Sequence, residues 1–143
     1  GDPYSCAFSG KALTFFSSRN LASPELVVQR TIDERIDSVF YSDEYAAAIV
    51  RNTNGEYGSR LEVYKKDGTH VLSKEFNFEY THADFDGDLI ILYNEDSCRI
   101  YNMSGTEKFD ATFDFPVSKI RKGRFPGTLV VTGPQQMQEL KLR

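Results

Sequence analysis

A pattern of short apolar segments and polar turns recurs along this sequence. One copy spans Phe85–Thr106, where an Asp-Gly-Asp turn leads into an apolar run and a second run ends in Tyr before a Gly-Thr turn. Leu61–Thr69 aligns with Cys98–Thr106 and shares its Tyr, its Gly-Thr pair and its apolar positions. Phe125–Val131 repeats the first turn and run. Because apolar and polar residues alternate, each copy predicts antiparallel strands joined by tight turns.

The spacing of about 40 residues is the period of four-stranded propeller blades. We therefore predict an all-β, antiparallel, propeller-like fold in a single domain over residues 1–143. The repeat units fall at about 3–35, 36–76, 77–115 and 116–143, with three, four, four and three strands. Blades stack to cover their faces, and an open or partial propeller of about 3.5–4 blades leaves faces uncovered. This predicts either a homodimer through those faces or further blades. A β-sandwich is the alternative fold.

Three segments need a choice between structures. The triple alanine Ala46–Ala48 favours a helix, but the segment between its turns is too short for one, so we predict a strand. Glu79–Asp84 is predicted as the innermost strand of its blade, with Asp84–Asp88 as the following turn. Thr31–Arg35 could form a helical turn capped by Thr31, and we favour a polar connection.

The segments that align carry a resemblance to a known fold family. They are Asp43 with Tyr45–Val50, Leu61–Thr69, Phe85–Ile91 and Cys98–Thr106. They resemble the repeats of quinoprotein-like and WD-type β-propellers, and the chain is similar to membrane-anchored, propeller-like ectodomains of Gram-positive bacteria. The Trp-Asp dipeptide of WD repeats is absent and the chain has no Trp, so no cofactor ligand carries over. The resemblance implies a propeller and an extracytoplasmic location, with no established activity.

Charge and hydropathy restrict the partners. The net charge of −4 gives no electrostatic support for binding nucleic acid or acidic lipid. The sequence has no run of about 18 apolar residues and no signal-peptide pattern. We therefore predict no nucleic-acid partner and no membrane contact by this segment. Gly1 stands where Met is usual, which predicts a trimmed N-terminus, with a signal or membrane anchor as the candidate for the missing part.

No motif in the sequence indicates a catalytic, cofactor-binding or metal-binding residue. Asp84–Asp88 resembles the start of a calcium loop, but its Gly is misplaced and no Glu closes the loop. His70 and His82 fall on different strands without metal-ligand spacing. There is no Gly-x-Ser-x-Gly element and no phosphate-binding loop.

The two cysteines allow three interpretations. Cys98 falls at the strand position equivalent to Leu61, so we favour a small, buried, apolar side chain. A disulfide between Cys6 and Cys98 is the second interpretation, and a reactive thiol is the third.

Propellers typically bind ligands at their central mouth, through loops that join inner strands. The repeat places Ser42–Glu44, Asp84–Asp88 and Arg124–Gly127 in such loops. The predicted binding residues are Asp43, Glu44, Asp86, Asp88 and Arg124.

Two further groups of side chains could bind a ligand. A basic cluster could hold an acidic partner or form the solvated face of a strand; it consists of Lys119, Arg121, Lys122 and Arg124. Three tyrosines that look exposed could line a binding surface or pack between blades; they are Tyr57, Tyr80 and Tyr93.

The sequence favours a non-catalytic binding or scaffolding module of a bacterial exported or surface protein, with an unknown protein or glycan as ligand. The alternative is a carbohydrate-active hydrolase or lyase that uses turn carboxylates. The candidates for that chemistry are Asp43, Asp86 and Asp88.

Overall fold

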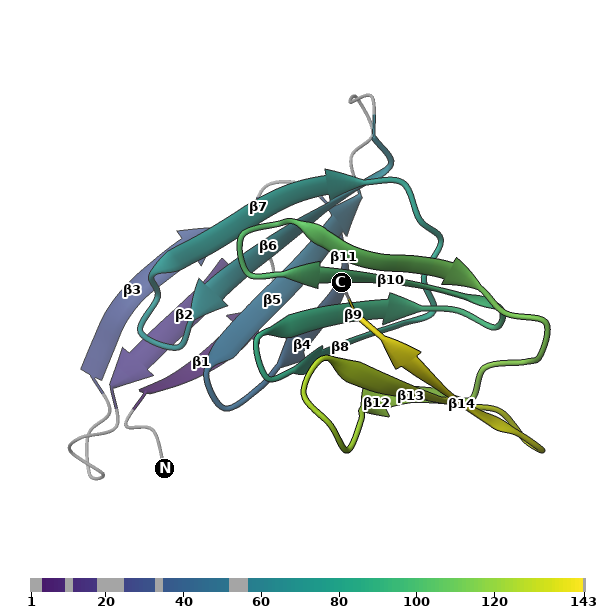
Figure 1. Cartoon of the computed structure of the whole chain (residues 1–143). Helices are drawn as coiled ribbons and strands as arrows, with labels where there is room; N and C mark the ends of the chain where they lie inside the picture. The colour runs from purple at the N-terminus through teal and green to yellow at the C-terminus, as the bar shows by residue number, and fades with distance from the viewer. Residues whose placement is uncertain (1–3, 10–11, 18–24, 33–34, 52–56, 143) are drawn as a thin grey trace. The chain divides into compact units, whose positions relative to one another are not determined.

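A computed structural model of the chain describes residues 4–9, 12–17, 25–32, 35–51 and 57–142. These residues form fourteen β-strands in four antiparallel sheets of three, four, four and three strands (Figure 1). The prediction of an all-β chain with this division of strands is confirmed. None of the four sheets closes on itself within the described residues, which is consistent with a partial propeller. The described residues include no helix long and apolar enough to cross a membrane.

The chain divides into two compact units, Gly1–Asn77 and Phe78–Arg143, called here the N-unit and the C-unit. The division falls next to the predicted boundary between the second and third repeats. Each unit consists of two sheets that share one core, so each is described by itself.

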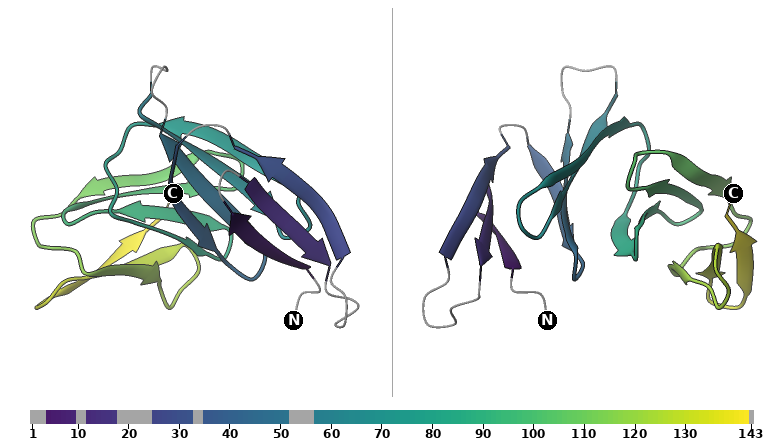
Figure 2. Two further views of the ribbon diagram at one scale, coloured as in Figure 1. Left: turned by 180° about the vertical axis from the view of Figure 1, so that it is seen from behind. Right: turned by 60° about the vertical axis from the view of Figure 1, so that its left-hand side comes forward.

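The N-unit contains the first two sheets. The three-stranded sheet has the order β1-β2-β3, with bounds Tyr4–Ser9, Ala12–Ser17 and Glu25–Thr31. The four-stranded sheet has the order β4-β5-β6-β7, with bounds Ile36–Tyr41, Tyr45–Arg51, Ser59–Lys65 and His70–Phe76. The two sheets stand face to face in the right-hand view of Figure 2, the first in purple and the second in blue and teal.

The C-unit has the same construction. Its four-stranded sheet has the order β8-β9-β10-β11, with bounds His82–Asp86, Leu89–Tyr93, Ser97–Asn102 and Glu107–Thr112. Its three-stranded sheet has the order β12-β13-β14, with bounds Lys119–Lys122, Thr128–Thr132 and Met137–Lys141. The predicted strand Glu79–Asp84 is wrong in its bounds, because pairing with β9 begins at His82 and continues to Asp86.

The core of the N-unit lies between its two sheets. Leu13 and Phe15 alternate on β2 and pack with Ala46, Ala48 and Val50 of β5, all of them 0% exposed. Alanine leaves room for the larger side chains of the facing sheet, because a packed interior must fill its volume without clashes. The triple alanine is therefore a strand, as predicted. Thr31 ends β3, and the part of the predicted connection at residues 33–34 lies outside the described residues.

A tight turn fastens the two sheets of the N-unit together outside this core. Gly68, in the β6–β7 turn, has φ 91°, and a Cβ there would lie 2.0 Å from Val28 Cγ1 of β3. The Arg30 guanidinium donates to the Gly68 carbonyl oxygen from Nε at 3.3 Å and from Nη2 at 3.1 Å. Only glycine satisfies both the left-handed backbone and the close approach to Val28.

The core of the C-unit is built in the same way. Ile91, Cys98 and Ile100 of the first sheet pack with Leu129 and Val131 of the second. Cys98 and Leu61 are both 0% exposed, which confirms that Cys98 is a buried strand residue. Cys6 and Cys98 are both free, so the structure does not support the disulfide interpretation.

Replacing Gly68 should destabilise the chain more than replacing a glycine that also has a positive φ but has free space around it. Gly127 has φ 75° and nothing within 4 Å of a Cβ. Gly127→Ala should cost about 1–2 kcal/mol from backbone strain alone, and Gly68→Ala about 1–3 kcal/mol more because its methyl group meets Val28. Urea unfolding of the two variants measures the difference. Equal losses would contradict this role for the contact with Val28.

Candidate functional site

The predicted binding loops lie on hairpins between the first two strands of three sheets. Ser42–Glu44 joins β4 to β5, Gly87 and Asp88 join β8 to β9, and 123–127 joins β12 to β13. The predicted turn at Asp84–Asp88 is too long, because Asp84 and Asp86 lie on β8. Pairing of Asp86 with Leu89 leaves a two-residue turn, and the positive φ of Gly87 (57°) suits such a turn.

The β4–β5 turn is held by its own hydrogen bonds. The Ser42 hydroxyl oxygen accepts from the amides of Glu44 (3.3 Å) and Tyr45 (3.1 Å). Lys66 donates its amide to the Glu44 carbonyl oxygen at 3.1 Å. Asp43 and Glu44 are both exposed on this ordered turn. They belong to the N-unit.

Within the C-unit, the structure brings the other two hairpins together. The Lys122 amide donates to Asp86 Oδ2 across 36 residues of sequence. The Lys122 Nζ lies 3.8 Å from the position that a Cβ on Gly87 would take. The β12–β13 turn has its own hydrogen bond, because the Thr128 hydroxyl donates to the Phe125 carbonyl oxygen at 2.6 Å. Asp86 and the Arg124 turn are thus parts of one ordered region.

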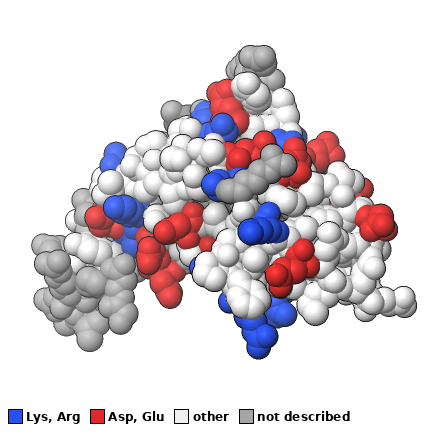
Figure 3. All heavy atoms as spheres, viewed as in Figure 1, with Lys and Arg blue, Asp and Glu red and all other residues white. Residues whose placement is uncertain are grey.

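The basic cluster lies on this region. All four of its side chains, Lys119, Arg121, Lys122 and Arg124, are exposed. Residues 115–138 contain these four cations and no acidic residue, giving this segment a charge of +4 while the rest of the chain carries −8. Lys and Arg atoms gather below the β12–β14 sheet in Figure 3. The mildly acidic net charge therefore hides a locally basic surface.

The strand register places part of this cluster on one face of the β12–β14 sheet. Lys119 pairs with Thr132 and Thr132 with Met137, while Arg121 pairs with Val130 and Val130 with Glu139. Side chains alternate across a strand, so these residues share a face, and Ile120, Leu129 and Val131 point to the core. Phe125 and Met137 are 58% and 65% exposed. We call Lys119, Arg121 and Met137, together with Arg124 and Phe125 of the adjoining turn, the basic surface.

Two networks of charged side chains were not predicted from the sequence. They lie at positions of the second and third repeat units that align with each other. In the N-unit, Glu62 is 9% exposed and accepts from Arg60 Nε and His70 Nε2, both at 3.0 Å, and from the Ser73 hydroxyl. In the C-unit, Arg99 Nε lies 3.1 Å from Glu107 Oε1, and Arg99 Nη2 lies 3.9 Å from Asp110 Oδ2.

The repeat alignment could have indicated these networks, because it aligns charged residues of one unit with charged residues of the other. Leu61–Thr69 falls on Cys98–Thr106, which places Glu62 on Arg99 and, a few residues on, His70 on Glu107. The same spacing thus holds an anionic centre in one blade and a cationic centre in the other. Each buried charge has partners of opposite charge or hydrogen-bond donors, as burial of a charge requires, so we interpret both networks as structural.

The remaining aromatic candidates divide between packing and exposure. Tyr93 is buried at 8% exposure and stacks on His82, with ring centroids 4.8 Å apart and 7° between the planes. The packing interpretation holds for Tyr93, which ends β9 beside its paired partner His82. Tyr57 is 39% exposed and Tyr80 is half-buried.

The titratable groups with shifted pKa values include both cysteines and Asp67. Burial raises the pKa of the Cys98 thiol to about 12. Burial also raises the pKa of Cys6, although the charge of Lys66 opposes the shift. Hydrogen bonds from Thr69 lower the pKa of Asp67, which stabilises a turn. No group of three or more His, Cys, Asp or Glu in the described part of the chain could hold a metal ion.

Comparisons with known proteins identify the fold. The model of a Family of unknown function (DUF5711) matches residues 1–142. No curated protein matches the sequence. Among solved structures, the chain is similar to BamB from Moraxella catarrhalis, with a TM-score of 0.61, 14% identity, and coverage of 99% of this chain and 42% of that chain. It is also similar to Hsv2p from Kluyveromyces lactis, with a TM-score of 0.60, 11% identity, and coverage of 98% and 44%.

A computationally designed protein, Ika4, is similar as well, with a TM-score of 0.53, 9% identity, and coverage of 97% of this chain and 90% of that chain. BamB and Hsv2p are β-propellers, so these likenesses support the propeller-like fold over the sandwich alternative. The chain spans less than half the length of either of them.

Removing the Asp86 carboxylate should loosen the edge of β12. Asp86→Ala leaves the Lys122 amide without its acceptor, and losing such a charge-assisted bond costs about 1.5–3 kcal/mol. Hydrogen exchange at the Lys122 amide should therefore become faster, while exchange in β5 stays unchanged. Asp86→Asn keeps an acceptor oxygen and should exchange at an intermediate rate. Unchanged exchange in Asp86→Ala would contradict the bond.

Thiol alkylation should separate the two cysteines. A thiol with a pKa of about 12 is thiolate in only about one molecule in ten thousand at pH 8. Because the thiolate is the nucleophile, Cys98 should stay unmodified by iodoacetamide in the folded chain. The half-buried Cys6 should react first, faster as pH rises. Mass spectrometry after timed labelling measures both sites, and equal labelling rates would contradict the burial of Cys98.

Proposed function

The chain belongs to the Family of unknown function (DUF5711), and from its fold and its exposed hairpin turns we propose that it is a non-catalytic binding or scaffolding module. The observation that carries the proposal is the ordered pair of hairpins in the C-unit. The bond from the Lys122 amide to Asp86 fixes these hairpins. They present Arg124 and Phe125 to solvent.

Ordered turns on a packed scaffold suit ligand binding. Loops held by rigid strands carry much of protein recognition, because little conformational entropy is lost when they bind. Phe125 leaves 58% of its surface in water beside an exposed arginine. Aromatic side chains and Arg are enriched at protein interfaces and among the residues that dominate binding energy. The Arg124 turn therefore has the composition of a contact surface.

The carboxylate arrangement does not favour the hydrolase or lyase alternative. Glycoside hydrolysis needs two carboxyl groups facing each other across a bond, about 5–10 Å apart. Asp86 uses its Oδ2 to bind the backbone of β12. Asp88 is exposed on its turn, and Asp43 belongs to the N-unit. The Asp86 carboxylate therefore serves the structure of the C-unit, which does not favour its use in acid–base work.

Export and membrane anchoring stay predictions that follow from the resemblance to propeller-like ectodomains. A homodimer stays a prediction as well. The proposed module binds a protein or a glycan, and its binding surface includes the predicted residues Asp86, Asp88 and Arg124. Asp43 and Glu44 form a second loop of the same kind in the N-unit.

The test is an array of peptides and glycans of acidic, neutral and basic charge, probed with the labelled chain. We expect one class of array member to retain the chain, and Arg124→Ala with Phe125→Ala to weaken that binding tenfold or more. Lys108→Ala on β11 removes a cation from another sheet and should leave binding unchanged. Glycan cleavage that disappears in Asp86→Asn would overturn the proposal in favour of an enzyme.

A further inference from the structure

We propose that the basic surface binds an acidic peptide segment of a protein partner. The proposal rests on the binding function proposed above and names the chemistry of its ligand. The occupant is an extended acidic chain with apolar side chains, lying along β12 and over the β12–β13 turn.

Charge gives the first argument. Among the described residues, no carboxylate forms an ion pair with the side chains of Lys119, Arg121 or Arg124. Glu139 lies on the same face, across Val130 from Arg121. The surface thus presents three cations whose charges are available to a ligand. A patch of one sign attracts partners of the opposite sign and speeds their association.

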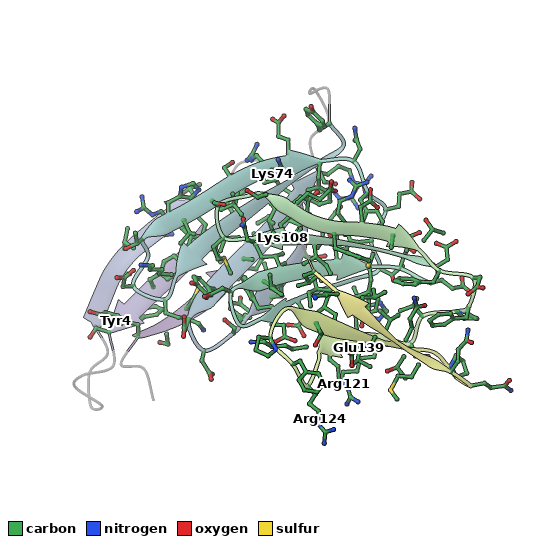
Figure 4. All side chains as sticks on the ribbon, viewed as in Figure 1. Tyr4, Lys74, Lys108, Arg121, Arg124 and Glu139 are labelled. Atoms are coloured by element: carbon green, nitrogen blue, oxygen red, sulfur yellow. The ribbon has the colours of Figure 1, made fainter. Side chains whose placement is uncertain are left out.

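The strand geometry gives the second argument. Lys119 and Arg121 are two residues apart on one face of β12, which separates their Cα atoms by about 6.6 Å. Successive side chains on one side of an extended peptide have the same spacing. Arg121 and Arg124 both project outward below the β12–β14 sheet in Figure 4. Acidic side chains at alternate positions of an extended peptide could therefore meet these cations, with bidentate bonds at the arginines.

The exposed apolar side chains distinguish a peptide from other polyanions. Met137 and Lys119 both pair with Thr132, from opposite sides of β13, and so lie on the same face. Phe125 follows Arg124 in the turn. Met137 and Phe125 each leave more than half of their surface in water. A peptide can cover them with its apolar side chains while its acidic side chains meet the cations. A short acidic and apolar segment fits both features.

The test is fluorescence anisotropy with a labelled peptide of about seven residues, in which Leu, Asp, Asp and Phe occupy alternate positions and so share one side of the extended chain. The full chain should bind it, and affinity should fall as salt rises. Arg121→Ala with Arg124→Ala should weaken binding tenfold or more. The control is Lys65→Ala with Lys108→Ala, which removes the same charge from β6 and β11 and should change affinity less than twofold. Glu139→Gln should tighten binding, because it removes the acidic group from this face.

The proposal would be overturned by no binding of the peptide, by equal binding of a peptide with Asn in place of Asp, or by equal weakening in the two double variants. Equally tight binding of an oligonucleotide would also overturn it, since the surface would then respond only to charge. Suppose that the chain binds no acidic peptide while Phe125→Ala abolishes its retention by another array member. That result would support the proposed binding function and reject an acidic peptide as its ligand. If no array member is retained, both fall.

Discussion

Every feature of this chain depends on covering the faces of small sheets. A sheet of three or four short strands has little stability unless one face packs on another element. In the N-unit the cover is mutual: Leu13 and Phe15 of one sheet pack with Ala46 and Val50 of the other. The C-unit repeats the arrangement with Ile100 and Leu129. Each hairpin turn takes its position from this core, so a turn can be ordered without a core of its own.

Contacts outside the cores fix how the sheets of each unit meet. In the N-unit the Gly68 turn lies against Val28 and accepts two hydrogen bonds from Arg30. In the C-unit the Asp86 carboxylate binds the backbone of β12. Apolar packing alone is non-directional, whereas these polar contacts have defined geometry. Within each unit, these polar contacts therefore fix the position of one sheet against the other, and the apolar residues hold the two sheets together.

The sequence allowed the fold to be predicted because its signals were local. The alternation of apolar residues and the recurring Gly-Thr turns indicated the strands and their division into units. The triple alanine was correctly placed in a strand, because the repeat outweighed its helix propensity. The β8 strand was misplaced because Asp is uncommon in strands, so Asp84 and Asp86 looked like a turn.

The candidate site could be predicted only in part. The turns themselves follow from Gly and Asp in the repeat, and the basic cluster is visible as four cations in six residues. The bond between Asp86 and Lys122 joins segments 36 residues apart, and no local pattern predicts such a contact. The burial of Tyr93 depends likewise on its cross-strand partner His82. Tertiary packing decides both.

The position of Asp86 has a consequence for the behaviour of the chain in concentrated solution. β12 is an edge strand, and the register with β13 directs the amides of Ile120 and Lys122 away from the sheet. Unpaired amides on an edge are a template on which a strand of another molecule can add. The Asp86 carboxylate occupies one of these amides and places a negative charge beside the edge. Charged side chains on an edge strand are a general means of hindering edge-to-edge aggregation.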